Sequence, residues 1–540
     1  MPPEIFTAIW IAALALLAAV ITVVAVRTSR LKTAEMSIQK PVYDPDEARR
    51  AAQNLASVIR LQTVSHADVT ARDYGQWLAF RKYLKKEYPL CAEHMELELV
   101  GGFSLLYKWA SPDPQGDPLL FCGHIDVVPA KGDWQVPPFE GRVEDGYIWG
   151  RGALDCKHIV ICLMETAESL IVRGFAPTRD IYFAFGHDEE IGGSEGAKNM
   201  AKIFAHRGLR FSMVLDEGSS LSDSTIPVGQ PVAEIGVSEK GFMNVRLTAR
   251  GRGGHSSRPP AHTALGVLSE ALCRIEFKPR RARLTPLIKD NLMALSPWLS
   301  YGDRMRLANL WLFKRSVIKR LCRDPHTAAL MRTTFAATMS SCGSAPNVLP
   351  DSAEAVINIR PLHGDSEKSI LAYIDALTSD LGIELEVMRS EPPGNISDYG
   401  GDVFASLSET VKKVFPGAPV AVGLLCGGSD ARSYEPYSDC VFRFSPFILT
   451  PEDENTIHGE NEKVAVASLG AAIGFYRALI ESLAGDGAEE SEDTASAEPV
   501  EDMKDKKDNY NDEGKDSTED AEPPEDGEND TTSESEDSVL

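Results

Sequence analysis

The chain has 540 residues and a formal net charge of −25, of which residues 486–540 carry −19 through 23 acidic residues and four lysines. The remaining −6 is spread over a length that suits at least two sizeable domains, and the absence of a basic stripe in the sequence argues against a nucleic-acid partner. Nine scattered cysteines, an odd number without the spacing of a small secreted domain, argue against a disulfide framework.

The first predicted element is a membrane-spanning helix over residues 5–26. This run has no charged residue and is long enough for a helix to cross about 30 Å of hydrocarbon. Glu4 precedes it, and Arg27 and Arg30 follow it, which is the reverse of a cleavable signal peptide with its basic amino-terminal region. By the positive-inside rule, these basic residues predict a single-pass anchor with a cytoplasmic catalytic domain. The glycosylation sequon at 395–397 would matter only in the opposite orientation.

A catalytic domain of the α/β class follows a linker that ends near residue 41. Helical patterns at 46–60, 158–173 and 193–207 alternate with apolar strands. This alternation predicts a mostly parallel sheet covered by helices. We place the first part of the domain at residues 41–238.

Several strand ends and turns in this domain carry metal-ligand side chains. They are His124 and Asp126 in FCGHIDVVP, Asp155 in GRGALDCK, Glu189 and Glu190 in DIYFAFGHDEE, and Asp216 in FSMVLDEG. His124 and Asp126 are two residues apart on a strand, so both side chains share one face. Ligands of open α/β sheets bind beyond the carboxyl ends of the strands, where we expect these residues to meet. Clustered carboxylates need neutralising cations, and the mixture of imidazole and carboxylate favours a catalytic zinc site.

These ordered motifs resemble the di-zinc aminoacylase and carboxypeptidase S family, relatives of succinyl-diaminopimelate desuccinylase in metallopeptidase clan MH, over roughly residues 45–480. The resemblance implies two zinc ions per chain, with manganese or cobalt as alternatives, which would activate a water and polarise the scissile carbonyl. The implied ligands are His124 with Glu190 or Asp216 as terminal ligands, Asp155 as the bridging carboxylate, and His458 in TIHGENE.

The same resemblance implies two catalytic acids, Asp126 and Glu189. Glu189 would take the proton of the attacking water and return it to the leaving amine. In this family the bridging aspartate is commonly followed by a cis peptide bond, so we expect one between Asp155 and Cys156.

From about residue 239 the pattern changes to a strand at 242–249, the glycine-rich loop GRGGHSSRPP and a helix, which predicts an inserted α+β lid and dimerisation domain at 239–392. By the resemblance, His255 of the loop would stabilise the oxyanion, often in the other subunit of a dimer. Asn347 and Arg360 would bind a substrate carboxylate, for which guanidinium is the natural partner. The alternatives are an ordinary loop role for His255 and a lid ion pair for Arg360.

A helix-rich, basic stretch at about 276–336 exceeds a minimal lid and resembles the insertion of larger carboxypeptidase S relatives. Its large apolar side chains include Trp298, Leu307, Leu310, Trp311 and Leu312. We expect them to pack against the lid; a membrane or an acyl chain is the alternative. The catalytic domain resumes at 393–484. Residues 485–540 form a predicted disordered acidic tail, too poor in apolar residues to offset the entropy of ordering.

The sequence therefore predicts a membrane-anchored di-zinc amidohydrolase. Its substrate would be a peptide C-terminal residue, a dipeptide or an N-acyl amino acid, and the lid would support a homodimer. The competing hypothesis is a catalytically silent binding or scaffold protein that keeps the fold. Retention of every ligand and of Glu189 speaks against it, because a decayed site usually loses its base or a ligand.

Overall fold

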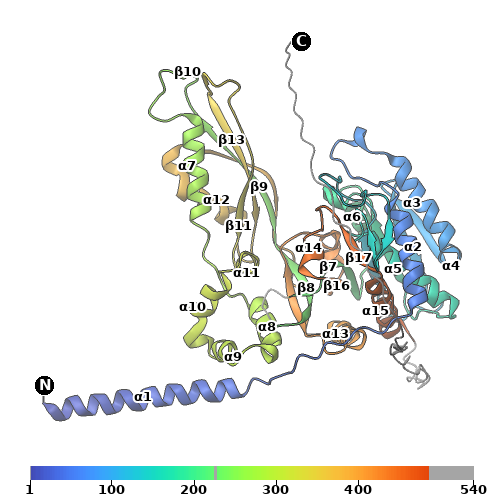
Figure 1. The fold of residues 1–540 in the computed structure, drawn as a ribbon, viewed down its shortest axis with the longest axis horizontal. Helices are drawn as coiled ribbons and strands as arrows, with labels where there is room; N and C mark the ends of the chain where they lie inside the picture. Colours follow the sequence, from blue (N-terminus) through green and yellow to red (C-terminus); the bar gives the residue numbers. More distant parts are fainter. Residues whose placement is uncertain (1, 224–227, 486–540) are drawn as a thin grey trace, which may run out of the picture. The chain divides into compact units, whose positions relative to one another are not determined.

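An eight-stranded mixed sheet carries the predicted site (Figure 1). The computed structural model describes residues 2–223 and 228–485, and the predicted acidic tail beyond residue 485 lies outside the described residues. In spatial order the strands are β1 (Met95–Val100), β2 (Ser104–Trp109), β6 (Ile181–Gly186), β3 (Leu119–His124), β7 (Met213–Asp223), β16 (Val441–Ile448), β8 (Pro231–Glu239) and β15 (Val420–Leu425). Strands β6, β3, β7 and β16 run parallel to one another, as does β15 to β8. The predicted α/β class with a parallel-rich sheet is confirmed.

Helices cover the faces of this sheet. Those of the catalytic part are α2 (Pro45–Ile59), α3 (Tyr74–Glu87), α4 (Pro89–His94), α5 (Lys157–Val172), α6 (Ala197–Arg207), α13 (Asp402–Val414), α14 (Pro451–Glu454) and α15 (Val466–Ala484), with the 3-10 helices η1 (Val69–Ala71), η2 (Glu189–Ile191) and η5 (Asp430–Tyr437). The helix expected at 193–207 begins later, at Ala197. The reason is local, because Gly192 and Gly193 adopt positive φ angles and the Asp188 carboxylate accepts the N–H groups of Glu195 and Gly196.

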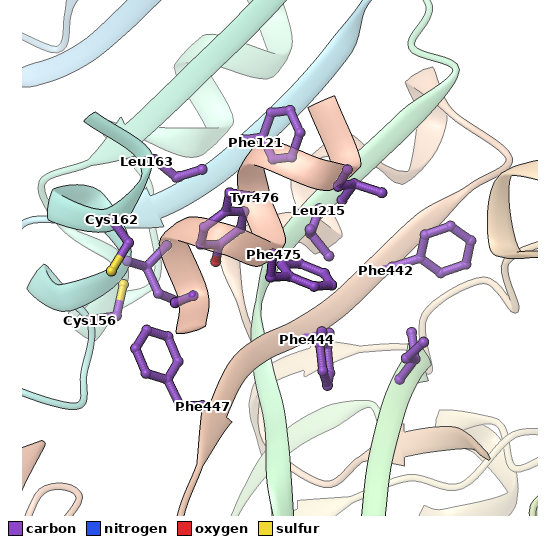
Figure 2. Close-up of a cluster of buried hydrophobic side chains, with 14 of the residues drawn as sticks. Phe121, Cys156, Cys162, Leu163, Leu215, Phe442, Phe444, Phe447, Phe475 and Tyr476 are labelled. Atoms are coloured by element: carbon purple, nitrogen blue, oxygen red, sulfur yellow. The ribbon is translucent and has the colours of Figure 1, made fainter. Parts of the chain in front are cut away.

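The main core lies between the sheet and the packed helices α2, α5 and α15. Strand alternation divides β3 between two cores: Phe121 faces this one, whereas Leu120 and Cys122 face the second core under α6. The Phe121 and Tyr476 rings lie 6.2 Å apart, edge to face. Figure 2 shows this cluster, in which side chains of β16 and α15 meet those of β3 and α5. The buried packing holds the strand ends that carry the predicted ligands.

A small three-stranded sheet supports the carboxyl-terminal ligand loop. It consists of β17 (Lys463–Ala465), β5 (Tyr147–Trp149) and β4 (Arg142–Glu144). Strand β17 pairs with β5 antiparallel, so the segment that follows His458 is tied to the segment that precedes Asp155. Two stretches far apart in the chain thereby reach the same site.

The predicted lid contains an antiparallel sheet with its own core. The strands, in spatial order, are β11 (Thr334–Cys342), β13 (Ser352–Arg360), β9 (Phe242–Arg250) and β14 (Glu384–Glu391). They pack against α7 (Ala264–Phe277) and α12 (Glu367–Thr378), which η4 (Ser379–Leu381) follows, and β10 (Gly254–His255) pairs with β12 (Val348–Leu349). All four sheet strands fall within 239–392, although the exact domain limits stay a prediction.

Between α7 and β11 lies a helical segment formed by α8 (Pro286–Leu295), η3 (Ser296–Trp298), α9 (Tyr301–Ala308), α10 (Leu310–Leu321) and α11 (Pro325–Leu330). We call it the helical insertion. The amino-terminal helix α1 (Pro3–Ser29) is apolar, exposed and long enough to cross a membrane. Helix α15 passes the same test of length and composition, but its apolar residues belong to the main core.

Candidate metal centre

The candidate centre forms where β3 and β6 end, beside β7, which continues past its two acids to Asp223. His124 is the last residue of β3, Glu189 and Glu190 lie in η2 just after β6, and Asp155 lies just before α5. The strands run parallel, so their carboxyl ends meet at one edge of the sheet. His458, in the loop after α14, completes the group with a left-handed φ of 60°. The sequence-predicted convergence therefore occurs for these five residues.

Asp155 lies between the two histidines. Its Oδ1 is 2.9 Å from His124 Nε2, and its Oδ2 is 2.8 Å from His458 Nε2. His458 Nε2 also lies 3.2 Å from Glu190 Oε2. One carboxylate thus offers a separate oxygen to each imidazole, which is the arrangement needed of a ligand shared by two cations. The peptide bond between Asp155 and Cys156 is cis, as expected.

The charges of this cluster fit metal binding. Burial raises the pKa of Glu189 well above its usual range, and the neighbouring carboxylates of Asp430, Asp155 and Glu190 raise it further. Hydrogen bonds to Asp155 and Glu190 raise the pKa of His458 to about 10. Buried Glu190 Oε1 has no hydrogen-bond partner among the residues that the structure describes. Crowded carboxylates and a buried oxygen without a hydrogen-bond partner would both be stabilised by bound cations. Imidazole and carboxylate together are a donor set that suits zinc.

Asp126 holds the ligands in place. His124 Nδ1 lies 3.0 Å from the Asp126 carbonyl oxygen and 3.4 Å from Oδ1. The Asp126 carboxylate accepts the backbone N–H groups of Glu189 and Glu190, each at 3.2 Å, and the Ser65 hydroxyl at 2.5 Å. Asp126 therefore orients the histidine ring mainly through its carbonyl oxygen, and its buried carboxylate orients the turn that carries the predicted base. Holding ligands in place is the usual task of a residue behind a metal ligand.

Strand β7 presents two adjacent acids: Asp216 stays the ligand predicted from the sequence, and we propose Glu217 as the alternative. Neighbouring strand residues point to opposite faces. Asp216 accepts the backbone N–H of Ala431 at 2.7 Å and that of Glu217 at 2.9 Å. The Glu217 carboxylate instead reaches Cys156 Sγ, 4.0 Å from Oε2, and Cys156 Sγ accepts the His124 N–H at 3.1 Å. The motif FSMVLDEG contains both acids, but the sequence alone does not indicate which side chain points towards the site.

We expect Glu217→Gln to weaken zinc binding by on the order of 100-fold or more, since loss of residues that merely support a ligand already costs 10- to 100-fold. Asp216→Asn should retain zinc, because the Asn carbonyl oxygen still accepts the Ala431 N–H. Equilibrium dialysis against a zinc buffer, followed by elemental analysis, measures both. The reverse ranking of the two variants would refute the proposal for Glu217 and support the predicted ligand Asp216.

A buried ion pair that sequence reasoning missed joins the two ligand loops. Glu462 accepts the N–H groups of Leu154 at 2.7 Å and Asp155 at 3.2 Å, and pairs with Arg151 at 2.5 Å. Arg151 also donates to the Gly459 carbonyl at 2.8 Å. Both charged side chains are buried, and breaking such a pair generally costs about 3–5 kcal/mol. The sequence shows Arg151 within GRGALD and Glu462 within IHGENE, charged residues to which no role was assigned.

A cavity of about 360 Å³ adjoins the candidate centre. Its lining includes the acids Glu189, Glu190 and Asp430 and the basic residues Arg360 and Arg389. The guanidinium groups of Arg360 and Arg389 lie 4.9 and 4.8 Å from the Phe242 ring centre. The cavity lining thus combines carboxylates with two guanidinium groups, of which Arg389 pairs with Glu391 at 2.7 Å.

His255 and Asn347, by contrast, are not among the described residues that line this cavity. His255 is exposed on β10, and the Ser256 N–H donates to the Asn347 carbonyl oxygen at 3.1 Å. The two predicted residues therefore lie together on the lid, whereas Arg360 lines the cavity. Within one chain, the structure brings only Arg360 to the candidate centre.

Comparison with known proteins adds four similarities. The sequence model of peptidase family M20/M25/M40 matches residues 120–482. The chain is 34% identical over 441 residues to a probable carboxypeptidase S-like 2 of Dictyostelium discoideum, covering 80% of this chain and 84% of that protein. It is 35% identical over 448 residues to N-fatty-acyl-amino acid synthase/hydrolase PM20D1 of Xenopus tropicalis, covering 81% and 86%. The fold resembles that of the M20 family metallo-carboxypeptidase Sso-CP2 from Sulfolobus solfataricus, with a TM-score of 0.60, 16% identity, and coverage of 80% and 98%.

Proposed function

Because this chain belongs to peptidase family M20/M25/M40 and is a metallohydrolase of the peptidase and amidohydrolase type, we propose that it is a membrane-anchored di-zinc enzyme. It would cleave an amide bond whose amine side bears a free carboxylate. The observation that carries this proposal is the position of Asp155, with one carboxylate oxygen within 3 Å of each of two histidine rings. When bound, a pair of zinc ions would activate a water molecule and polarise the scissile carbonyl.

The described side chains support one division of roles. His124, Asp155, Glu190, His458 and a β7 acid would hold the metals. Glu189 borders the cavity beside Glu190, where it can take a proton from water and pass it to the leaving amine. Its buried, carboxylate-rich surroundings favour the protonated form that the second transfer requires. Manganese or cobalt is the alternative metal, since both accept nitrogen and oxygen donors.

The mixed lining of the cavity, with carboxylates and guanidinium groups, supports a substrate that carries both a scissile amide and a carboxylate. Arg360 can bind the substrate carboxylate through two N–H groups while the amide lies at the carboxylates of the lining. C-terminal residues of peptides, dipeptides and N-acyl amino acids all meet this requirement. The names of the two relatives, a carboxypeptidase S-like protein and an N-fatty-acyl-amino acid synthase/hydrolase, fit the same class.

A homodimer would explain the position of His255 and Asn347. Both lie on the lid away from the cavity of their own chain, and β11 is exposed from Ala336 to Cys342. We propose that the pair serves the centre of a second copy, with His255 donating to the oxyanion. The anchor would be α1, with the catalytic part on the cytoplasmic side according to the basic residues Arg27 and Arg30.

The test is a substrate panel of N-acyl amino acids and dipeptides, each paired with its carboxamide. We expect wild-type enzyme to prefer the free carboxylates, and Arg360→Gln to lower kcat/KM for them by about 100-fold, the worth of two charge-assisted hydrogen bonds. Carboxamide turnover should be unchanged in the variant. Arg246→Gln is the matched control, because Arg246 also belongs to the lid sheet but pairs with exposed Glu386. Failure of metal-loaded enzyme to hydrolyse any member of the panel would refute the proposed function.

A further inference from the structure

The last turn of α1 is bonded directly to the helical insertion. Asn309, between α9 and α10, is fully buried. Its Nδ2 donates to the Val24 carbonyl oxygen and to Thr28 Oγ1, both at 3.3 Å. Thr28 is buried, whereas nearly all of α1 is exposed. A polar side chain with no exposure thus joins the end of the apolar helix to the insertion.

The segment after α1 strengthens this attachment. The Ala34 N–H donates to the Pro297 carbonyl oxygen at 3.0 Å, and Trp298 Nε1 donates to the Glu35 carbonyl oxygen at 3.3 Å. The segment that follows α1 is therefore hydrogen-bonded to the insertion and holds it beside the end of α1.

The length of α1 sets the depth of this junction. A helix of 27 residues is about 40 Å long, which exceeds the roughly 30 Å of bilayer hydrocarbon. If α1 spans the bilayer, Thr28 and the bonded Asn309 lie in the headgroup layer. Arg27 and Arg30, at the same end of the helix, suit that level because cationic side chains are favoured there.

Helix α10, which starts next to Asn309, has the side chains of a helix that lies in this layer. Trp311 is 55% exposed and Leu312 is 48% exposed, and Trp311 Nε1 donates to Asn309 Oδ1 at 3.3 Å. An exposed tryptophan therefore lies beside the last turn of α1. Of the large apolar residues of the insertion, Leu307 is buried, but in the main core and not, as expected, in the core of the lid sheet, whereas Trp311 and Leu312 are exposed.

The charge of the insertion is opposite to that of the chain. Residues 286–330, which span the insertion, contain eight arginine or lysine residues and three aspartates, although the whole chain carries −25. On α10, Lys314, Arg315 and Lys319 are exposed. Aromatic and basic side chains together on a short exposed helix are typical of binding to an anionic bilayer surface.

We propose that α10 lies in the interface of an anionic membrane leaflet, with Trp311 and Leu312 at the acyl boundary and Lys314, Arg315 and Lys319 on lipid headgroups. This inference rests on the membrane anchoring proposed for α1. It has a consequence for the enzyme, because Lys240 lines the cavity and donates to the Ala329 and Arg332 carbonyl oxygens at the end of the insertion, each at 2.9 Å. The cavity is then held at the bilayer surface, where amphiphilic amides collect.

Tryptophan quenching in nanodiscs tests the position of α10. The full chain is reconstituted in phosphatidylcholine and phosphatidylserine, with or without bromine near the glycerol end of the acyl chains. Quenching is compared among wild type, Trp311→Phe and the control Trp134→Phe, which alters a catalytic-part tryptophan near Arg151. We expect Trp311→Phe to lose a lipid-quenched signal that Trp134→Phe keeps.

Trp10 lies inside α1, so its quenching tests the membrane anchor separately from the placement of α10. Its contribution is the difference in quenching between wild type and Trp10→Phe. Quenching of Trp10 by bromolipid without quenching of Trp311 overturns the placement of α10 and leaves the anchor intact. Absence of quenching at Trp10 overturns both. Protection of Trp311 from bromolipid and from aqueous iodide alike would mean a protein partner or a second copy, and also refutes the lipid assignment.

The basic side chains are tested separately by lipid composition. Quenching of Trp311 should rise when phosphatidylserine is present, and Lys314→Gln, Arg315→Gln and Lys319→Gln combined should remove that rise. The matched control removes three positive charges from α3, by Lys82→Gln, Lys85→Gln and Lys86→Gln. Equal quenching in neutral and anionic nanodiscs would overturn the electrostatic part of the inference.

Discussion

Replacing Glu189 with glutamine should lower kcat by about 10³-fold, the middle of the range for loss of a general acid–base group. Glutamine has nearly the same shape, and the ligand distances between Asp155, His124 and His458 do not involve Glu189. Metal content should therefore stay at the wild-type value. Steady-state kinetics on an N-acyl amino acid, together with elemental analysis of the same sample, provide the two measurements.

Glu195→Gln is the control for this variant. Glu195 follows Glu189 closely in sequence, but its side chain is 47% exposed and its carboxylate is 3.7 Å from Arg72. The control should keep full activity. If Glu189→Gln retains activity with metals bound, another group carries the proton; if it loses both activity and metals, Glu189 is a ligand and not the base.

Replacing Asp155 with asparagine should remove most of the bound metal as well as the activity. The carboxylate contacts both histidine rings, and asparagine offers one neutral oxygen where two charged ones stood. We expect about two zinc ions per wild-type chain and fewer than one in the variant, with turnover below detection. Elemental analysis after gel filtration measures the content.

Circular dichroism checks that the Asp155→Asn protein is folded. Asp145→Asn serves as the control, since Asp145 is exposed and its left-handed φ of 51° is one that asparagine tolerates. A folded Asp155→Asn enzyme with wild-type metal content would exclude the bridging role.

Much of the fold follows from local sequence patterns. The uncharged run before Arg27 predicts α1, and the alternation of apolar strands with helices predicts the α/β sheet. Ligands that follow neighbouring parallel strands meet at one edge of the sheet, which is why His124 and Glu190 are predicted to converge, with Asp155 reaching them from a turn. Such inferences succeed because periodicity and strand-end position depend on neighbouring residues.

Only the tertiary structure shows which face of β7 each of its two acidic side chains occupies. Asp216 and Glu217 are adjacent, and a strand shifted by one residue would exchange their faces. The register with β16, where Asp216 lies opposite Arg443, decides which acid reaches Cys156. No local pattern encodes that choice.

The sequence by itself determined the family, the parallel-rich sheet and the set of metal-ligand side chains, because these are written in contiguous motifs. Only the tertiary structure decided that Glu462 fixes Asp155 across 307 positions, that His255 lies away from its own centre, and that Asn309 joins the insertion to α1. Each of these is a contact between segments far apart in the chain. Such contacts depend on packing of the whole molecule, which a motif read along the chain does not contain.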